Sequence, residues 1–364
     1  MHMADALISP AVGGTMWIVT AGLIAYCARK LKQTKKDNVV PMMGVLGAFV
    51  FAAMMINFSI PGTGSSGHLG GGLILSVLLG PHAAFLVIAS VLTVQAFFFA
   101  DGGLLALGCN IFNLGFYPAF IAYPFIYRLI ARGEYGTARA WIAAVIAAVV
   151  GLQLGAFSVV FETQASGISE LPFGAFILLM LPIHLAIGIV EGLATATVVS
   201  FVARARPEIL AAAPAAAESQ INLRPALPSS RAQAEGSKPE RTVLIGLAIA
   251  AVIIGGAVSW FASIHPDGLE WSIAKVIGKE EVSGSEDKLQ KNLAQLQEKT
   301  AFLPDYDFKA TEAEPTTKEN TSSEPEWPAV SAGTSVSGIV GGLLTLTLAG
   351  LVGFALKARR TVIR

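Results

Sequence analysis

Two long stretches of the sequence carry almost no charge. Residues 40–127 contain a single charged side chain, Asp101, and residues 140–203 contain three, all of them glutamates. One bilayer crossing takes about 20 residues, so stretches of this length require several crossings each. The composition agrees, because 54% of the residues are apolar and 14% are charged, against about 25% charged in ordinary soluble domains. The sequence therefore predicts an all-α, polytopic bundle of membrane-spanning helices.

Positive and negative charges balance over the whole chain. There are 25 Lys and Arg residues and 25 Asp and Glu residues. Without a basic or acidic excess, the overall charge does not point to nucleic acid or to an acidic partner, and we expect neither. The two cysteines, Cys27 and Cys109, cannot form a disulfide framework and are expected to be packing residues.

Apolar windows bounded by charged or turn residues predict nine membrane spans. With nine crossings and an outside N-terminus, 18 of the 25 basic residues fall on the cytoplasmic side. The other seven lie in one long outside loop, and long loops are largely exempt from the positive-inside rule. We therefore expect a multi-pass protein of the bacterial inner membrane, with its N-terminus outside and its C-terminus in the cytoplasm. The nine windows are residues 11–30, 40–58, 68–80, 82–100, 104–130, 139–162, 172–203, 242–263 and 335–356.

The chain divides into a body, a linker and an appendix. Residues 1–203 hold seven of the predicted spans and form the body, and residues 242–364 hold the other two and form the appendix. Residues 204–241 are rich in Ala, Pro and Ser with scattered charges, which is typical of a flexible cytoplasmic linker.

The appendix contains the long outside loop, residues 264–334. This loop has 14 acidic and 7 basic residues. We expect one short amphipathic helix near Asp287–Lys299 and a disordered stretch at Thr311–Glu326.

The first two residues can chelate a metal ion. His2 is bulky, and bacterial removal of the initiator methionine generally needs a small second residue, so we expect Met1 to stay in place. The Met1 amine, the His2 amide nitrogen and His2 Nδ1 then close adjacent chelate rings around one ion. Three nitrogens from one short strand enforce a planar arrangement, which favours Ni(II) or Cu(II). The segment lacks the basic and apolar regions of a cleavable signal peptide. The alternative interpretation is a frayed terminus without a ligand role.

A fourth nitrogen is available from His68, in the loop Pro61–Gly72. The predicted topology places this loop on the same side of the membrane as the N-terminus. Its six glycines allow the backbone to approach a bound ion closely. The alternative is a flexible, solvated loop whose histidine is merely polar.

The same loop contains Gly62-Thr-Gly-Ser-Ser-Gly67, which matches the spacing GxGxxG. A dinucleotide site needs this motif after a strand in a soluble βαβ unit, and a phosphate-binding loop needs Lys and then Ser or Thr where this chain has His68 and Leu69. Both interpretations fail. We expect a protein that is not an enzyme and does not hydrolyse ATP by that route.

Four other polar residues lie within the predicted spans. His184 and Glu191 are seven residues apart on one face of the seventh span, and ionisable groups inside a membrane are seldom without a role. They fit helix packing, mutual pairing or support of a metal ligand. A membrane hydrolase built on them would need a further ligand or nucleophile, which the sequence does not offer. Asn110 and Asn113 fit either interhelical hydrogen bonds or the orientation of ligands.

Several motifs in a fixed order resemble a known family. Over residues 1–203 the chain is similar to the NikM and CbiM proteins, the substrate-binding components of nickel and cobalt energy-coupling-factor (ECF) transporters. A later stretch is similar to their small accessory components, NikN and CbiN, so the chain resembles a fusion of the two. The motifs are Met1-His2-x-x-Asp5, Ser9-Pro10, Thr63-Gly-Ser-Ser-Gly-His68, Asp101-Gly-Gly-Leu-x-x-Leu-Gly-Cys-Asn110-Ile-Phe-Asn113 and, for the accessory part, Pro266-Asp-Gly-Leu-Glu-Trp271.

This resemblance implies a seven-helix body whose N-terminus is tucked into a central outer pocket. The metal ligands would be the Met1 amine, the His2 amide and imidazole, and His68, in a near-planar site. The residues expected to support these ligands are Asp5, Asn110, Asn113, His184 and Glu191. The implied partners are a transmembrane coupling subunit, a cytoplasmic ATPase and the lipid bilayer. No resident cofactor is expected beyond the transported Ni²⁺ or Co²⁺.

The expected function is ATP-driven uptake of nickel, with cobalt as the next preference. One alternative is cobalt uptake for cobalamin synthesis by the same mechanism. The other is a secondary permease driven by an ion gradient. A permease predicts paired mid-membrane carboxylates and repeated halves, whereas Glu191 is the only acidic residue deep within a predicted span.

Overall fold

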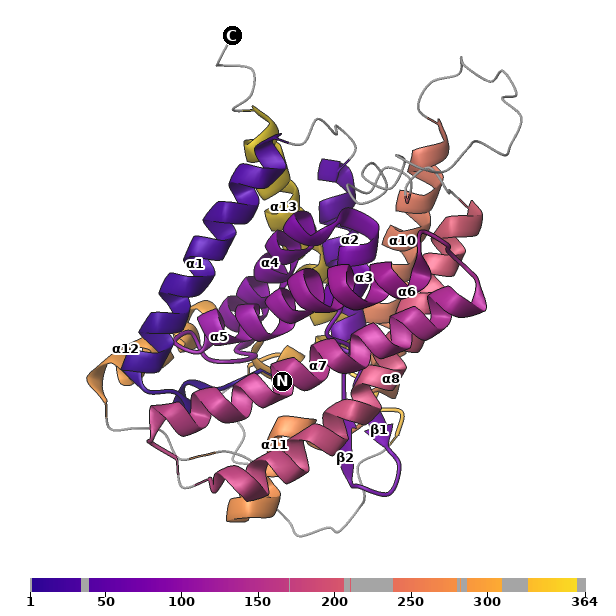
Figure 1. Cartoon of the computed structure of the whole chain (residues 1–364). Coiled ribbons are helices and arrows are strands. Elements are labelled where there is room, and N and C mark those ends of the chain that lie inside the picture. The colour runs from indigo at the N-terminus through magenta and orange to yellow at the C-terminus, as the bar shows by residue number, and fades with distance from the viewer. Residues whose placement is uncertain are drawn as a thin grey trace, which may run out of the picture.

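The computed structural model shows a helical bundle (Figure 1). It describes residues 2–33, 39–169, 171–205, 210, 238–279, 282, 287–309 and 327–358. The predicted all-α bundle is confirmed. Met1, most of the linker at 204–241 and the stretch at 311–326 lie outside the described residues, so what the sequence predicts for them stays a prediction.

The body consists of apolar helices in the predicted order. A short 3-10 turn, η1 (Asp5–Leu7), precedes them. One long helical segment is composite, and its middle part, η2, has wider π-helical turns around two prolines that lack a backbone donor. The helices are α1 (Pro10–Gln33), α2 (Val39–Met54), α3 (Gly72–Leu79), α4 (Pro81–Phe99), the composite α5 (Leu107–Ile111), η2 (Phe112–Tyr127) and α6 (Arg128–Ala131), α7 (Ala138–Ser166) and α8 (Phe173–Ala205).

The appendix contributes two long helices and the elements between them. The predicted amphipathic helix is present as α12, and Asp287 caps it by accepting a hydrogen bond from Leu289 N at 2.7 Å. The elements are α10 (Lys238–Gly256), η4 (Val258–Phe261), α11 (Gly268–Ile277), α12 (Lys288–Thr300), η5 (Pro304–Tyr306) and α13 (Ala332–Ala358).

Six helical segments in the described residues are long and apolar enough to cross a bilayer: α1, α4, the composite α5–α6 segment, α7, α8 and α13. Helix α2 and the apolar part of α10, Thr242–Gly256, are shorter. With eight residues, α3 is about 12 Å long, so this helix alone does not span a hydrocarbon core of about 30 Å. The prediction of a span over 68–80 is wrong in its first part, because residues 68–71 are not helical. Gly71, with φ 72°, turns the chain into α3.

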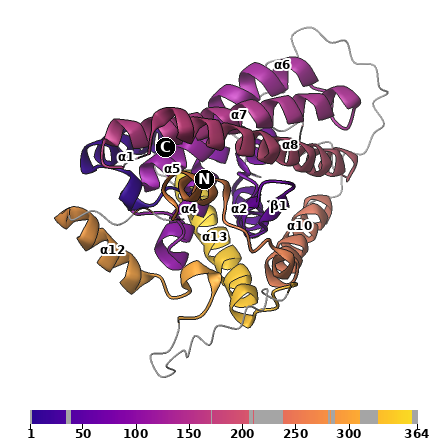
Figure 2. The same cartoon turned by 90° about the horizontal axis from the view of Figure 1, so that it is seen from below.

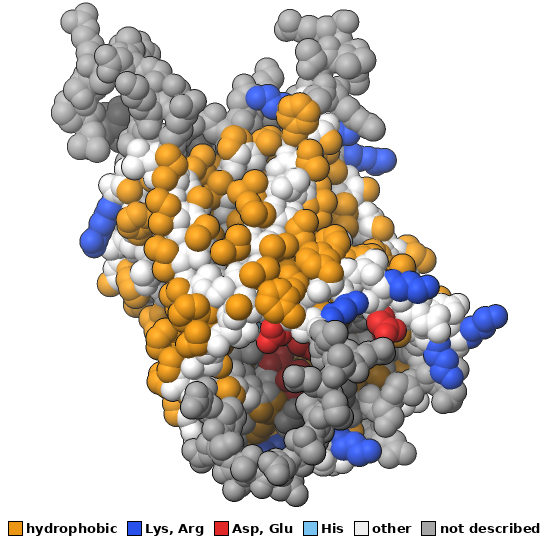
Figure 3. Space-filling model, turned by 180° about the vertical axis from the view of Figure 1, so that it is seen from behind, with side chains coloured by type: hydrophobic (Ala, Val, Ile, Leu, Met, Phe, Trp, Pro, Cys, Tyr) orange, Lys and Arg blue, Asp and Glu red, His pale blue; other side chains and the backbone are white. Residues whose placement is uncertain are grey.

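The surface fits a membrane protein. Exposed apolar side chains form a broad band over the helices, and Lys and Arg side chains lie mostly toward the two ends of the molecule (Figure 3). On α8, for example, Leu178, Leu185 and Leu193 are 72%, 45% and 45% exposed. An apolar face of this extent suits a lipid environment.

The two helices α10 and α13 of the appendix pack against α2 of the body (Figures 1 and 2). Glycines allow the close approach. A Cβ at Gly44 of α2 would lie 2.9 Å from the carbonyl oxygen of Leu346 in α13. A Cβ at Gly338 of α13 would lie 2.1 Å from the carbonyl oxygen of Gly255 in α10. Small residues at these crossings let the backbones pack directly on one another.

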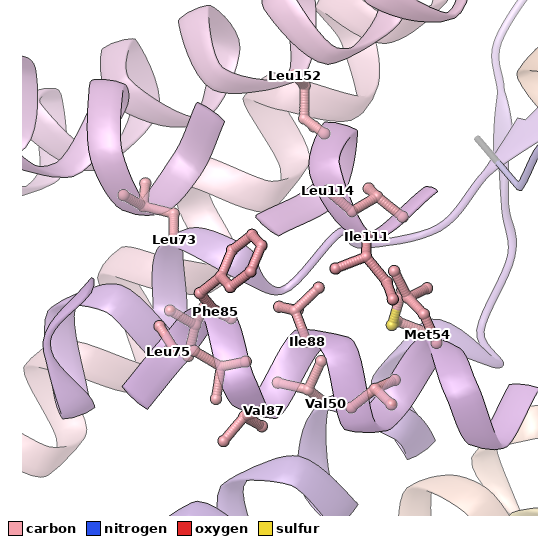
Figure 4. Packing of buried hydrophobic residues seen from close by; sticks show 14 of the residues in the cluster. Val50, Met54, Leu73, Leu75, Phe85, Val87, Ile88, Ile111, Leu114 and Leu152 are labelled. Atoms are coloured by element: carbon pink, nitrogen blue, oxygen red, sulfur yellow. The ribbon is translucent and has the colours of Figure 1, made fainter. Parts of the chain in front are cut away.

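Buried apolar side chains from several helices meet around α3 (Figure 4). All eight residues of α3 are buried. Leu73 of α3, Val50 of α2, Phe85 of α4, Leu114 of η2 and Leu152 of α7 are each 3% exposed or less. The short chain segment that enters α3 is therefore held at the centre of the body.

A small β hairpin precedes this segment, and the sequence analysis did not predict it. Strands β1 (Phe58–Ile60) and β2 (Ser65–Gly67) pair antiparallel. The turn between them contains Gly62 and Gly64, with φ 78° and 76°. The run Pro61-Gly-Thr-Gly64 is the turn signal that could have revealed it. The hairpin, α11 and α12 lie at the same end of the molecule (Figure 1), here named the hairpin end.

Candidate metal-binding site

The N-terminal segment runs into the bundle and is held there through its backbone. Met3 is fully buried. Asn110 forms two hydrogen bonds with the backbone of this residue. Met3 N donates to Asn110 Oδ1 at 2.8 Å, and Asn110 Nδ2 donates to the Met3 carbonyl oxygen at 3.2 Å. Gly103 N donates to the same carbonyl oxygen at 2.9 Å. These bonds fix residue 3 and therefore the position of His2 beside it.

Asp5 anchors the same segment a little further along. Its Oδ1 accepts a hydrogen bond from Ala106 N at 3.0 Å, just before α5, where amides at a helix start need partners. Gly103 faces this carboxylate, and a Cβ there would lie 1.9 Å from Asp5 Oδ1. Only glycine fits at position 103, so Asp5 and the turn after Asp101 interlock.

His2 and His68 come together, as predicted. Their rings stack with centroids 5.0 Å apart and planes 15° from parallel. Burial lowers the pKa of His2 to about 3 and the pKa of His68 to about 4, so both imidazoles are neutral at pH 7. A neutral imidazole keeps a lone pair for a metal ion.

The hydrogen bonding of His68 determines which nitrogen it offers. Its Nδ1 lies 3.1 Å from the carbonyl oxygen of Leu69, to which it donates. The other nitrogen, Nε2, then carries the lone pair, and it is buried without a hydrogen-bond partner among the described residues. A ring nitrogen held in this way is typical of a metal-ligating histidine.

Asp101 connects His2 to the appendix. His2 Nδ1 lies 3.2 Å from Asp101 Oδ1. The hydroxyl of Tyr306, in η5, donates to Asp101 Oδ2 at 2.5 Å and accepts from Gln95 Nε2 at 3.2 Å. Burial raises the pKa of Asp101. Sequence analysis included Asp101 only as part of a motif and missed Tyr306, which no local pattern links to the N-terminus.

The appendix also holds the hairpin that leads to His68. Ser66 N donates to the carbonyl oxygen of Pro266 at 2.8 Å, and Ser66 pairs with Asp267 in a short parallel bridge. Trp271 Nε1 donates to the carbonyl oxygen of Thr63 at 3.0 Å. The stretch at 266–271, which the sequence analysis singled out, thus docks on the loop of the body that carries the second histidine.

Helix α12 lies against the N-terminal segment. Gln290 Nε2 donates to the carbonyl oxygens of Asp5 and Ile8 at 2.8 and 2.7 Å. Gln297 Nε2 donates to the carbonyl oxygen of Gly102 at 2.7 Å. The sequence predicted the helix but not these contacts. The available signal was the spacing of the two glutamines, seven residues apart and so on one face.

A cavity of about 520 Å³ lies beside the two histidines at the hairpin end. Five acidic side chains line it, and no Lys or Arg is among the described residues of its wall. Figure 3 shows acidic side chains in a recess at this end of the molecule. A wall lined by negatively charged side chains raises the local concentration of cations. The polar side chains of the wall include His2, His68, Asp5, Asp101, Asp267, Glu270, Asp305 and Tyr306.

Glu191 and Asn113, both predicted to support the ligands, differ in their surroundings. Glu191 Oε2 accepts a hydrogen bond from Gly70 N at 2.7 Å, so it holds the backbone two residues after His68. Asn113 Nδ2 instead donates to Glu162 at 2.8 Å, between η2 and α7. Asn113 therefore forms an interhelical hydrogen bond, the first of the two roles weighed for it.

His184 is buried on α8 and lines a small cavity together with His68. In the described part of the chain, no three side chains of His, Cys, Asp or Glu gather into a ready-made metal site. Met1 lies outside the described residues, and the ligand roles of His2 and His68 stay predictions.

An all-helical, multi-pass bundle with a cation-attracting cavity beside buried imidazoles defines a membrane transport component. The chain belongs to the CbiM family, described as the cobalt uptake substrate-specific transmembrane region, whose profile matches residues 2–209. Residues 241–358 match the PDGLE domain. The chain is thus a NikM/CbiM-type body fused to a NikN-like part.

Three known proteins illustrate the similarity. The chain is 37% identical over 214 residues to the putative fused nickel transport protein NikMN of Archaeoglobus fulgidus, which covers 58% of this chain and 68% of that one. It is 30% identical over 217 residues to the cobalt transport protein CbiM of Sorangium cellulosum, covering 58% and 94%. The crystal structure of a truncated transition metal transporter matches with a TM-score of 0.50 and 29% identity, covering 56% of this chain and 99% of that one.

Proposed function

We propose that this protein is the metal-binding component of an ATP-driven uptake system for Ni²⁺, with Co²⁺ as the next preference. The observation that carries the proposal is the stacked pair of His2 and His68, two neutral and buried imidazoles that come from separate segments. The two ions are supported by the family and by relatives named for nickel and for cobalt transport.

Four nitrogens hold the ion in this proposal. They are the Met1 amine, the His2 amide nitrogen, His2 Nδ1 and His68 Nε2. Four nitrogens in one plane favour Ni(II). Asn110 and Asp5 fix the backbone that follows, so the chelating strand is held in place before the ion arrives.

Capture requires two changes at His2. The contact between Nδ1 and Asp101 breaks and the ring proton moves from Nδ1 to Nε2, so that Nδ1 offers its lone pair to the metal. The amide of His2 loses its proton, so binding releases protons and weakens at low pH. A deprotonated amide and neutral imidazoles lower the net charge of the bound ion, which reduces the cost of holding it near hydrocarbon.

Two further components complete the system. The resemblance to ECF transporters implies that a separate cytoplasmic ATPase and a transmembrane coupling subunit supply the driving force. The distribution of basic residues favours a hairpin end that faces the outside and a C-terminus in the cytoplasm. Release on the inside requires that the N-terminal segment be pulled away from His68.

A membrane hydrolase built on His184 and Glu191 receives no support. His184 Nδ1 donates to the Met180 carbonyl oxygen at 2.8 Å, and Glu191 accepts from Gly70 N. The relatives of this chain are named as transport proteins.

Equilibrium binding of Ni²⁺ to the purified full-length protein tests the chelate. A tag added before Met1 removes the free amine and is expected to abolish tight binding, whereas the same tag at the C-terminus leaves it intact. His68→Ala is expected to weaken binding and to change the absorption spectrum of the bound ion. Full-strength binding by the N-terminally extended protein would overturn the proposed ligand set.

One insertion tests the geometry separately. An alanine inserted after Met1 creates four nitrogens within the N-terminal strand itself, so Ni²⁺ binding is expected to become independent of His68. Continued dependence on His68 in the inserted protein would contradict the proposed arrangement.

Transport into membrane vesicles tests the source of energy. We expect uptake only when the ATPase and the coupling subunit are present and ATP is supplied. Uptake driven by a proton or sodium gradient alone would assign the protein to the secondary permeases instead.

A further inference from the structure

His184 is a buried imidazole that the proposed capture site does not use. Its side chain is on α8, and the residue is 1% exposed. Because Nδ1 donates to the carbonyl oxygen of Met180 at 2.8 Å, the other nitrogen, Nε2, carries a lone pair. That Nε2 is buried and has no hydrogen-bond partner among the described residues. Buried polar atoms are rarely left unpaired, so the atom calls for a partner beyond the described residues.

A small cavity lies where such a partner would sit. Its volume is about 10 Å³, enough for a single water-sized occupant. His184 and His68 both line it, as does Asp267 of the appendix. Leu114 and Leu152, seen in Figure 4, form part of its apolar wall. An occupant in this position meets two imidazoles and a carboxylate-bearing residue.

Two glycines bring the walls of this cavity together. A Cβ at Gly67 would lie 2.4 Å from Ile187 Cγ1, so the strand that leads to His68 lies directly on α8. A Cβ at Gly268 would lie 3.4 Å from His184 Cε1, the carbon next to Nε2. The strand that leads to His68, helix α8 and the appendix thus meet beside Nε2 of His184.

Glu191 fixes the far wall of the cavity. Its Oε2 accepts a hydrogen bond from Gly70 N at 2.7 Å, and Gly70 lines the cavity. The loop around His68 is therefore attached to α8 on both sides, through the contact of Gly67 and through Glu191. A site with fixed walls presents its donors without rearrangement.

We propose that His68 and His184 form a second cation site, which receives a divalent transition-metal ion from the N-terminal chelate. This inference rests on the proposed function, because the chelate delivers the ion. Imidazole nitrogen suits nickel, cobalt and zinc. His68 belongs to both sites, so the ion exchanges the nitrogens of residues 1 and 2 for His184 without leaving His68. Two imidazoles hold an ion less tightly than four nitrogens, which suits a site from which the ion moves on.

Binding of Co²⁺ to the full-length protein with an N-terminal extension tests the second site. The extension removes the amine from the chelate and leaves His68 and His184 in place. We expect one equivalent of Co²⁺ bound more than about 100-fold more weakly than in the unextended protein, because loss of even a supporting group costs about 10- to 100-fold. His184→Ala in the extended protein is expected to abolish this residual binding. His82→Ala, which changes a histidine at the start of α4, is the matched control and leaves it intact.

A gained signal complements the lost one. In the extended protein, His184→Cys places a thiol at the cavity, and a thiolate-to-Co(II) charge-transfer band is expected, whereas His82→Cys gives none. Tight Ni²⁺ binding by the unextended His184→Ala and His184→Cys proteins verifies that these variants fold. In vesicles with the ATPase present, unextended His184→Ala is expected to keep its capture affinity and to lose about tenfold or more in uptake rate.

The outcomes separate this inference from the proposed function. Residual Co²⁺ binding that His184→Ala leaves unchanged, no residual binding at all, or a folded His184→Cys protein without the charge-transfer band would overturn the second site. Full-strength binding by the extended protein would overturn the N-terminal chelate itself.

Discussion

A single side-chain amide holds the N-terminal segment. Asn110 accepts from the Met3 N–H and donates to the Met3 carbonyl group, so it pairs with the backbone as a neighbouring strand would. An aspartate at this position would accept but not donate, and an aliphatic residue would do neither. Asn113, three residues later, pairs with Glu162 instead. The two asparagines therefore form a natural test and control.

We expect Asn110→Ala to weaken Ni²⁺ binding by about 10- to 100-fold, the usual effect of removing a group that orients a ligand. Asn113→Ala is expected to leave the affinity unchanged, even if it lowers the melting temperature by leaving Glu162 without this partner. Titration calorimetry and thermal unfolding measure the two effects. Equal losses of affinity in both variants would contradict the specific role of Asn110.

Gly103→Ala is expected to abolish tight binding while the bundle still folds. The added Cβ would lie 1.9 Å from Asp5 Oδ1 and 2.4 Å from Asp5 N, so the N-terminal segment must move away. Gly14→Ala on α1 is the control, because nothing lies within 4 Å of its Cβ position. Binding assays on both variants, with gel filtration to verify folding, decide the result. Tight binding by Gly103→Ala would show that the segment adjusts at no cost.

At the scale of elements, α12 lies against the N-terminal segment and is hydrogen-bonded to it. It is largely polar and exposed, yet Gln290 is 5% exposed and donates to two carbonyl oxygens of that segment. Gln297 attaches the same helix to Gly102. Helix α12 connects the appendix to the N-terminal segment through side-chain amides rather than through apolar packing.

Gln290→Ala removes two hydrogen bonds, each worth about 0.5–1.5 kcal/mol. We expect faster hydrogen exchange in residues 3–9 and Ni²⁺ binding weaker by about tenfold. Gln295→Ala, on the exposed face of the same helix, is the matched control and is expected to change neither. Mass-spectrometric hydrogen exchange and titration calorimetry measure both. Unchanged exchange in Gln290→Ala would mean that α12 does not restrain the segment.

The helix α3 shows where local patterns mislead. The window at 68–80 is apolar and contains no charge, so hydropathy predicts a span. In the structure the first residues of this window are not helical, because Gly71 has φ 72° and Gly70 N is bonded to Glu191 rather than to a helical turn. Gly70 and Gly71, where the helical pattern fails, lie two and three residues after His68 and help to position it.

At the scale of the whole molecule, the appendix packs directly on the body rather than forming a separate, tethered domain. Its two long helices cross α2 and each other at glycines. The elements between these helices contact the hairpin, Asp101 and the N-terminal segment. The body and the appendix are therefore expected to associate without a covalent link.

Residues 1–205 and 238–364 expressed as two separate chains are expected to copurify in detergent and to bind Ni²⁺ as the intact protein does. Gly341→Leu is expected to separate them, since a Cβ there would lie 2.0 Å from Phe51 Cζ. Gly246→Leu, whose Cβ position has nothing within 4 Å, is the control. Copurification through a tag on one half measures the association. Full-strength metal binding by residues 1–205 alone would contradict a contribution of the appendix to the site.

The proximity of two candidate ligands could be predicted from the sequence. His2 and His68 were paired on chemical grounds, and the structure stacks their rings. The contacts of Asp101 with Tyr306 and of Gln290 with Asp5 were not predicted, because these partners are 205 and 285 residues apart. No periodicity links positions at such distances.

The sequence by itself determined that the chain is a helical membrane protein and which of its segments are apolar, and it predicted a metal chelate at the first residues. Hydropathy and ligand chemistry are local properties, so they can be read from neighbouring residues. Only the tertiary structure decided that α3 is short, that α12 of the appendix contacts the N-terminal segment, that Asp101 lies beside His2, and that His184 lines a cavity together with His68. Those features depend on how the helices pack in three dimensions, and packing is not contained in any single stretch of the chain.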